Sequence, residues 1–196
     1  EWSTLTKLTL EYNFYKKMII VDVNNYIAVD KKNVSKKKGL FDTWDADPDK
    51  IEYHKNPSNL IVPKALEAFY VRDIDYKDFI RNHKDIFDFL SVVKKKKDFD
   101  LNLKKICGSE ITYEPQQKVT RFYASKKGGR LVKYFKSGKK TGSKVIVLRD
   151  TLVTPLNKIE DVPLHFQNIN YEFYIKETEK IIKTISPPSK NQLSLF

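Results

Sequence analysis

Two runs of strand-forming residues around a glycine pair constrain the fold of this chain most strongly. Residues 118–124 (KVTRFYA) and 130–135 (RLVKYF) are rich in β-branched and aromatic residues. The turn between them contains Lys126, Lys127, Gly128 and Gly129. Glycine adopts the positive φ angles that tight turns need, so this pattern predicts an antiparallel hairpin.

Apolar residues at helical spacing predict a long helix over residues 171–185. Its apolar stripe consists of Tyr171, Tyr174, Ile175, Thr178, Ile181, Ile182 and Ile185. Pro63 suits the first turn of a helix that continues through Leu66 and Phe69, and Asp75 is placed to cap another.

Short apolar runs predict further strands. Residues 18–21 and 26–29 are such runs near the N-terminus, and residues 144–148 form another after the glycine pair. Residues 42–58 carry Asp, Pro, Asn and Ser and are expected to form a loop. With both helices and β hairpins expected, the predicted fold class is α+β.

The charge of the chain constrains what it binds. It has 37 Lys and Arg against 25 Asp and Glu, a formal net charge of +12. Each phosphate that a cation neutralises releases counterions, so nucleic acid is the leading partner class, while an anionic membrane surface remains open on charge alone. No apolar run approaches the roughly 20 residues that span a bilayer. The lone Cys107 is compatible with a reducing compartment.

Signatures of catalysis and metal binding are missing from the sequence. The three histidines, none of them at metal-ligand spacing, are His54, His83 and His165. Asp45 and Asp47 have the spacing of a paired-carboxylate site for two metal ions. Trp44 and Pro48 flank them instead of apolar strands, so we interpret this segment as a solvated acidic loop. We therefore expect no catalytic or metal-binding residues in this chain.

Two groups of residues combine basic and aromatic side chains in the predicted β structure. The first group is Tyr26, Lys36, Lys37 and Lys38, and the second is Arg121, Tyr123, Lys126 and Lys127. A cation beside an aromatic ring on adjoining strands suits phosphate contact together with stacking on a base or packing against a sugar. These eight residues are the candidate nucleic-acid contacts. The other lysine clusters are interpreted as solvated surface.

Seven short blocks occur in a characteristic order along most of the chain. They are residues 22–29 (DVNNYIAV), 36–41 (KKKGLF), 54–58 (HKNPS), 61–65 (IVPKA), 80–89 (IRNHKDIFDF), 117–133 (QKVTRFYASKKGGRLVK) and 169–175 (INYEFYI). In this order they resemble the C-terminal part of family B DNA polymerases of large phages.

This resemblance implies the end of a polymerase palm at residues 1–55 and a thumb of helices, a β-hairpin insert and a final helix at residues 56–185. In that family a Lys-x-Tyr element touches the primer–template. Here it reads Asn24-Asn25-Tyr26, so phosphate contact is expected from Lys36, Lys37 and Lys38. The catalytic aspartates and their Mg²⁺ are expected upstream, in the rest of the polymerase chain. Duplex or primer–template DNA is the implied partner, in the cytoplasm of a phage-infected bacterial host.

The C-terminal residues 186–196 carry a separate signal. Pro187 and Pro188 predict a flexible tail. The residues Gln192, Leu193, Leu195 and Phe196 at its end resemble the peptide by which bacterial replication proteins dock on the sliding clamp. An amphipathic tail that packs back on the domain is the alternative.

Two other functions stay open on the sequence. One is a stand-alone nucleic-acid-binding replication accessory protein that docks on a clamp. The other is an independent nuclease or transferase, which would need a carboxylate cluster for metal that the sequence does not show. The absence of an initiator Met before Glu1 leads us to expect an internal or C-terminal piece of a longer chain.

Overall fold

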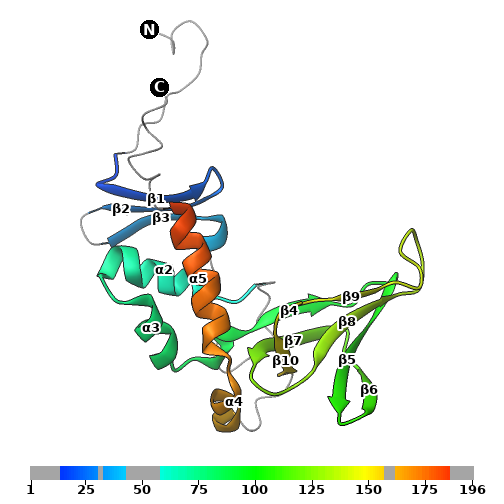
Figure 1. The fold of residues 1–196 in the computed structure, drawn as a ribbon. Coiled ribbons are helices and arrows are strands. Elements are labelled where there is room, and N and C mark those ends of the chain that lie inside the picture. The colour runs from blue at the N-terminus through cyan, green and yellow to red at the C-terminus, as the bar shows by residue number, and fades with distance from the viewer. Residues whose placement is uncertain (1–13, 31–32, 43–57, 157–161, 186–196) are drawn as a thin grey trace, which may run out of the picture.

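The computed structural model describes residues 14–30, 33–42, 58–156 and 162–185, which form an α+β fold (Figure 1). Three small antiparallel sheets and four α-helices make up this described part. The loop predicted at residues 42–58 and the tail predicted at 186–196 lie almost wholly outside the described residues.

The N-terminal sheet consists of β1 (Lys17–Asp22), β2 (Asn25–Asp30) and β3 (Asn33–Lys38) in that order. It confirms the strands predicted near the N-terminus. Ile19 and Ile27 are a cross-strand pair on its inner face and are almost fully buried. A short 3₁₀ turn, η1 (Gly39–Phe41), follows β3 and adds Phe41 to the same core.

Two helices, α2 (Ile61–Arg72) and α5 (Tyr171–Ile185), pack against the inner face of this sheet, and α3 (Tyr76–Asn82) packs against both helices (Figure 1). The helix predicted at residues 171–185 and the Asp75 cap are both confirmed. Asp75 Oδ1 accepts hydrogen bonds from two backbone N–H groups of the first turn of α3, at 2.8 and 3.0 Å. Within the described residues, no helix combines the length and apolar character needed to cross a membrane.

A buried carboxylate joins α2 to the segment that follows α3. Asp88 lies in the 3₁₀ turn η3 (Ile86–Phe89), and its side chain is only 3% exposed. It accepts hydrogen bonds from Lys64 Nζ at 2.8 and 2.9 Å, and His83 Nε2 lies 2.5 Å from its Oδ2. Desolvation raises the pKa of Asp88, but hydrogen bonds from His83 and Lys64 outweigh it and leave the pKa below its ordinary value.

A buried tyrosine joins α5 to the β structure. The Tyr174 hydroxyl donates to the Phe89 carbonyl at 2.8 Å and accepts from the Ala124 N–H at 2.8 Å. Burial raises the pKa of Tyr174 strongly, so the hydroxyl keeps the proton that it donates. One hydroxyl therefore satisfies two backbone groups in the core.

The remaining strands form two sheets that pack face to face. The three-stranded sheet has the order β10 (Leu152–Pro155), β7 (Val119–Ser125), β4 (Ser91–Lys94). The four-stranded sheet has the order β6 (Glu110–Pro115), β5 (Phe99–Cys107), β8 (Arg130–Phe135), β9 (Lys144–Ile146). The buried residues between them are Leu101, Leu103, Phe122, Leu131 and Val153. A short helix, α4 (Val162–Asn168), leads from this β part to α5.

The hairpin predicted around the glycine pair is wrong. β7 pairs with β4 and β10, whereas β8 pairs with β5 and β9, so the turn carries the chain from one sheet to the other. Gly129 exchanges two backbone hydrogen bonds with Val153 of β10, at 3.0 and 2.8 Å. Gly128 has a φ of +154° and lies so close to β10 that a Cβ there would be 2.4 Å from the Val153 carbonyl oxygen. β7 and β8 pair with strands distant in sequence because this arrangement buries apolar side chains between the two sheets.

The buried apolar residues form two clusters. The larger one combines the N-terminal sheet, the helices, η3 and part of β7, and the smaller one lies between the two β sheets. The predicted boundary at residue 55 falls in the undescribed segment 43–57. Apolar packing nevertheless joins the parts on either side of it, since Ile27 and Leu66 belong to one cluster.

Candidate nucleic-acid interface

The outer face of the N-terminal sheet brings two lysines next to a tyrosine. Tyr26 of β2 lies directly opposite Lys38 of β3, and Ala28 lies opposite Lys36. Directly paired residues share one face of a sheet, so Lys36 and Lys38 lie on the same face as Tyr26, with Lys38 directly across from it and Lys36 diagonal to it. Both lysines are exposed, and Tyr26 is half-buried. We call Tyr26, Lys36 and Lys38 the palm-face cluster.

Lys37 points to the other face. It lies opposite the buried Ile27, and its Nζ forms an ion pair with Glu67 of α2 at 2.6 Å. The alternation of a strand therefore separates three consecutive lysines that the sequence had grouped together. Lys37 faces α2, whereas Lys36 and Lys38 face away from it.

A hydrogen-bonded turn holds the palm-face cluster in place. Asp22 accepts from the Asn24 N–H at 2.8 Å and from Asn25 Nδ2 at 2.8 and 2.9 Å. Asn25 Oδ1 in turn accepts from the Leu40 N–H at 2.6 Å. Hydrogen bonds from Asn25 and Asn24 keep the pKa of Asp22 below its ordinary value.

Gly39 is required at the end of β3. Its φ is +63°, and a Cβ there would lie 2.1 Å from the Asn24 carbonyl oxygen. This close approach fixes the end of β3, with Lys38, against the β1–β2 turn. The Asn24 carbonyl and the Asn25 side chain thus both serve this turn.

Arg121 and Tyr123 of the second candidate group lie inside the molecule. Arg121 is 8% exposed and Tyr123 is 1% exposed. The Tyr123 hydroxyl lies 2.7 Å from His165 Nδ1 and 3.4 Å from the Asn168 amide nitrogen. Side chains so deeply buried do not reach a phosphate in this fold. We therefore leave both out of the interface and assign them a structural role.

Lys126 and Lys127 are exposed, on the turn between β7 and β8. Asn168 holds this turn: its carbonyl accepts from the Lys126 N–H at 2.8 Å, and its side chain both accepts from the Lys127 N–H and donates to the Lys127 carbonyl, each at 2.9 Å. The backbone is thus fixed, and the two ammonium groups extend from a fixed base.

The structure does not bring the two candidate groups together. Lys126 and Lys127 lie beside the N-terminal end of α5, whereas the palm-face cluster lies beyond its C-terminal end (Figure 1). A helix of this length spans about 22 Å at 1.5 Å per residue. A single duplex would have to extend along the whole of α5 to contact both groups. We therefore treat them as two separate contacts.

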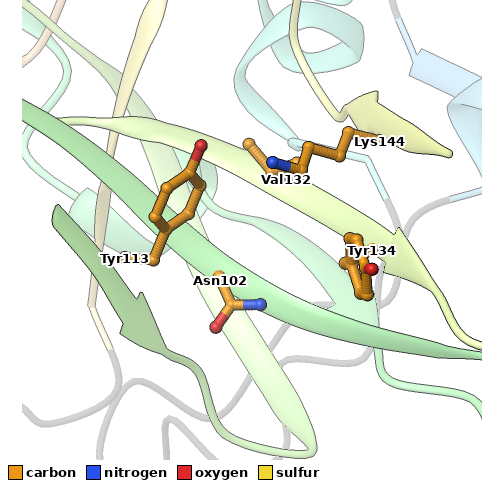
Figure 2. A pocket seen from close by; sticks show the side chains of 5 residues that line it. All are labelled: Asn102, Tyr113, Val132, Tyr134 and Lys144. Atoms are coloured by element: carbon orange, nitrogen blue, oxygen red, sulfur yellow. The ribbon is translucent and has the colours of Figure 1, made fainter. Parts of the chain in front are cut away.

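One group of residues on the surface was not predicted from the sequence. Tyr113, Tyr134 and Lys144 surround Asn102 and Val132 in a shallow pocket of about 340 Å³ on the outer face of the four-stranded sheet (Figure 2). The residues come from four different strands. Asn102 alternates with the buried Leu101 and Leu103, which was a usable signal, but only the strand register, which is non-local, brings the five residues together.

Several predicted features lie outside the described residues. They are the acidic loop residues Asp45 and Asp47 and the tail residues Gln192, Leu193, Leu195 and Phe196. Among the residues that are described, no group of three or more His, Cys, Asp or Glu side chains could hold a metal ion.

Comparisons with protein-family models, curated proteins and solved structures give no match for this chain.

Proposed function

We propose that this chain is the C-terminal palm-and-thumb part of a DNA-directed DNA polymerase and grips primer–template duplex without reading its sequence. The observation that carries the proposal is the palm-face cluster, in which Tyr26 of β2 shares one sheet face with two exposed lysines of the neighbouring strand β3. The ordered blocks that resemble phage family B polymerases support the same assignment.

The chemistry of the palm-face cluster suits the DNA backbone. Lysine ammonium groups contact phosphates as point charges and carry no information about the base. The half-buried Tyr26 offers a ring for packing against a sugar. Because the Asp22, Asn25 and Leu40 hydrogen bonds fix the strand ends, the cluster meets the duplex already ordered.

Neutralising the two outward lysines should weaken duplex binding strongly. We expect the variant Lys36→Gln/Lys38→Gln to lose roughly tenfold in affinity per lysine at 0.1 M salt, because each lost phosphate contact no longer releases counterions. Lys37→Gln is the matched control, since Lys37 faces α2 and pairs with Glu67. Fluorescence anisotropy with a labelled primer–template measures the difference. Equal losses for the control and the double variant would contradict the proposal.

The polymerase assignment places catalysis outside this chain. The aspartates that hold Mg²⁺ are expected upstream, in the rest of the polymerase chain, acting in the cytoplasm of a phage-infected bacterium. The alternative is a stand-alone replication accessory protein. The coding sequence upstream of Glu1 separates them: an open frame leading to an apolar-flanked Asp-x-Asp supports the polymerase, and a start codon beside Glu1 supports the accessory protein.

We further propose that the C-terminal tail docks on a sliding clamp. A peptide spanning residues 186–196 should bind the clamp with a Kd around micromolar, because ordering a short segment costs entropy. Leu195→Ala or Phe196→Ala should each weaken binding by about 2 kcal/mol, since both would fill an apolar pocket. Calorimetry beside a peptide that ends at Asn191 measures this. Equal binding of the two peptides would contradict the docking role.

A further inference from the structure

The outer face of the four-stranded sheet is an aromatic and cationic surface. The register places five such residues on this one face: Tyr113 and Arg130 lie opposite Lys104, and Tyr134 lies opposite Lys144. The two sets share a face because they are an even number of residues apart along the strands. Tyr113 is 46% and Tyr134 is 41% exposed. The inner face of the same strands carries the buried Leu101, Leu103 and Leu131.

The face is concave. Tyr113 lies on β6 at one edge and Lys144 on β9 at the other, yet Lys144 Nζ lies 5.2 Å from the centre of the Tyr113 ring (Figure 2). Strands in a flat sheet are about 4.8 Å apart, so the contact across two intervening strands requires a curved sheet. Figure 2 shows the Tyr113 ring standing up from the floor, with Asn102 between it and Tyr134.

The charge on this face is positive. The register places one acidic residue of β5, Asp100, on the same face as the cations Lys104, Arg130 and Lys144. Asp100 is already neutralised, because it forms ion pairs with Lys95 and with Lys136, the latter at 2.9 Å. Hydrogen bonds from Lys95 and Lys136 lower the pKa of Asp100, which keeps these pairs charged.

We propose that this face binds single-stranded nucleic acid by stacking unpaired bases on Tyr113 and Tyr134. Exposed aromatic rings on a cationic surface are the arrangement that holds single strands, since every base has a face for stacking. Lys104, Arg130 and Lys144 contact the phosphates between the stacked bases. A duplex does not fit this role, because its bases are already stacked on one another.

The site is independent of the palm-face cluster. The two surfaces belong to different sheets, which lie well apart in Figure 1. One contacts the backbone of a duplex, and the other requires unpaired bases. A chain with both could hold a junction between double-stranded and single-stranded nucleic acid.

Removing the tyrosine rings tests the stacking site. With the full chain and a short fluorescein-labelled oligothymidylate, anisotropy should show that Tyr113→Ala and Tyr134→Ala each lose roughly tenfold in affinity. Tyr113→Phe and Tyr134→Phe should retain binding, because the ring remains. Phe14→Ala, which removes an exposed ring elsewhere, is the matched control. Both tyrosines are exposed, so circular dichroism should show all variants folded.

Further measurements distinguish DNA from RNA as the ligand and separate the stacking site from the palm-face cluster. Equal binding of oligothymidylate and oligouridylate supports a site for either nucleic acid, and a preference assigns the site to one of them. Duplex affinity should be unchanged in Tyr113→Ala/Tyr134→Ala, which separates this site from the palm-face cluster. The proposal is overturned if the unchanged chain binds no single strand, if the alanine variants bind as tightly as it does, or if a duplex displaces the oligonucleotide equally well.

Discussion

Replacing Asp88 with alanine is expected to lower the free energy of unfolding by about 3 kcal/mol. The carboxylate is 3% exposed and is the common partner of Lys64 and His83, so its removal leaves both without their shared acceptor. The loss should lie at the low end for broken buried pairs, because the Lys64 and His83 side chains, 29% and 17% exposed, still reach water. Urea denaturation of the two proteins measures the difference.

The exposed pair between Lys105 and Glu114, at 2.6 Å, is the control for Asp88. Lys105→Ala should cost less than about 1 kcal/mol, because water screens an exposed ion pair. A loss for Asp88→Ala no larger than this would contradict a stabilising role for the buried carboxylate.

The lowered pKa of Asp88 also determines how its contribution to the free energy of unfolding changes with pH. In the unfolded chain the group has its ordinary pKa near 3.8, and in the folded protein its pKa is lower. The stabilisation is therefore complete above the unfolded value and is lost as the pH falls through the folded one. Asp88→Ala should accordingly differ most from the unchanged protein near neutral pH and converge with it in acid.

Tyr174→Phe is expected to lower the free energy of unfolding by about 2 to 4 kcal/mol. The substitution keeps the ring and its edge-to-face contact with Phe89, at 5.2 Å between centroids, but removes the hydroxyl. The Phe89 carbonyl and the Ala124 N–H then lose a partner in the core, and each unsatisfied buried group costs about 1 to 3 kcal/mol. Thermal and urea denaturation measure the loss.

Tyr171→Phe provides the matched control on the same helix. The Tyr171 hydroxyl makes a single long hydrogen bond, 3.4 Å to the Phe166 carbonyl, from a partly exposed position. Its removal should cost less than about 1 kcal/mol. Equal effects of the two substitutions would show that the Tyr174 hydroxyl does not link α5 to β7 and η3.

Local signals in the sequence predicted the local structure well. The spacing of apolar residues predicted α5, and Asp75 predicted the start of α3. Both predictions succeeded because helical spacing and capping depend only on residues a few positions apart in the sequence. The pairing of β7 and β8 was wrong for the opposite reason. A glycine pair shows that the chain turns, but the partners of each strand depend on β4, β5 and β10, far away in sequence.

The candidate site could be predicted only in part. The sequence grouped Lys36, Lys37 and Lys38, but strand alternation alone would have assigned Lys37 to the opposite face from its neighbours. The burial of Arg121 and Tyr123 could not be predicted, because a polar or aromatic side chain on a strand can occupy either face. The pocket around Tyr113 and Tyr134 depends on the register of four strands, which no local signal fixes.

The salt dependence of duplex binding tests the central claim most directly. We expect log K to fall linearly with log salt concentration, and the slope to become shallower by about 1.8 in Lys36→Gln/Lys38→Gln, since each phosphate contact contributes about 0.9. The change should be the same on two duplexes of unrelated sequence, and Lys37→Gln should leave the slope unaltered. An unchanged slope in the double variant, or a change that depends on the duplex sequence, would contradict backbone contact by the palm-face cluster.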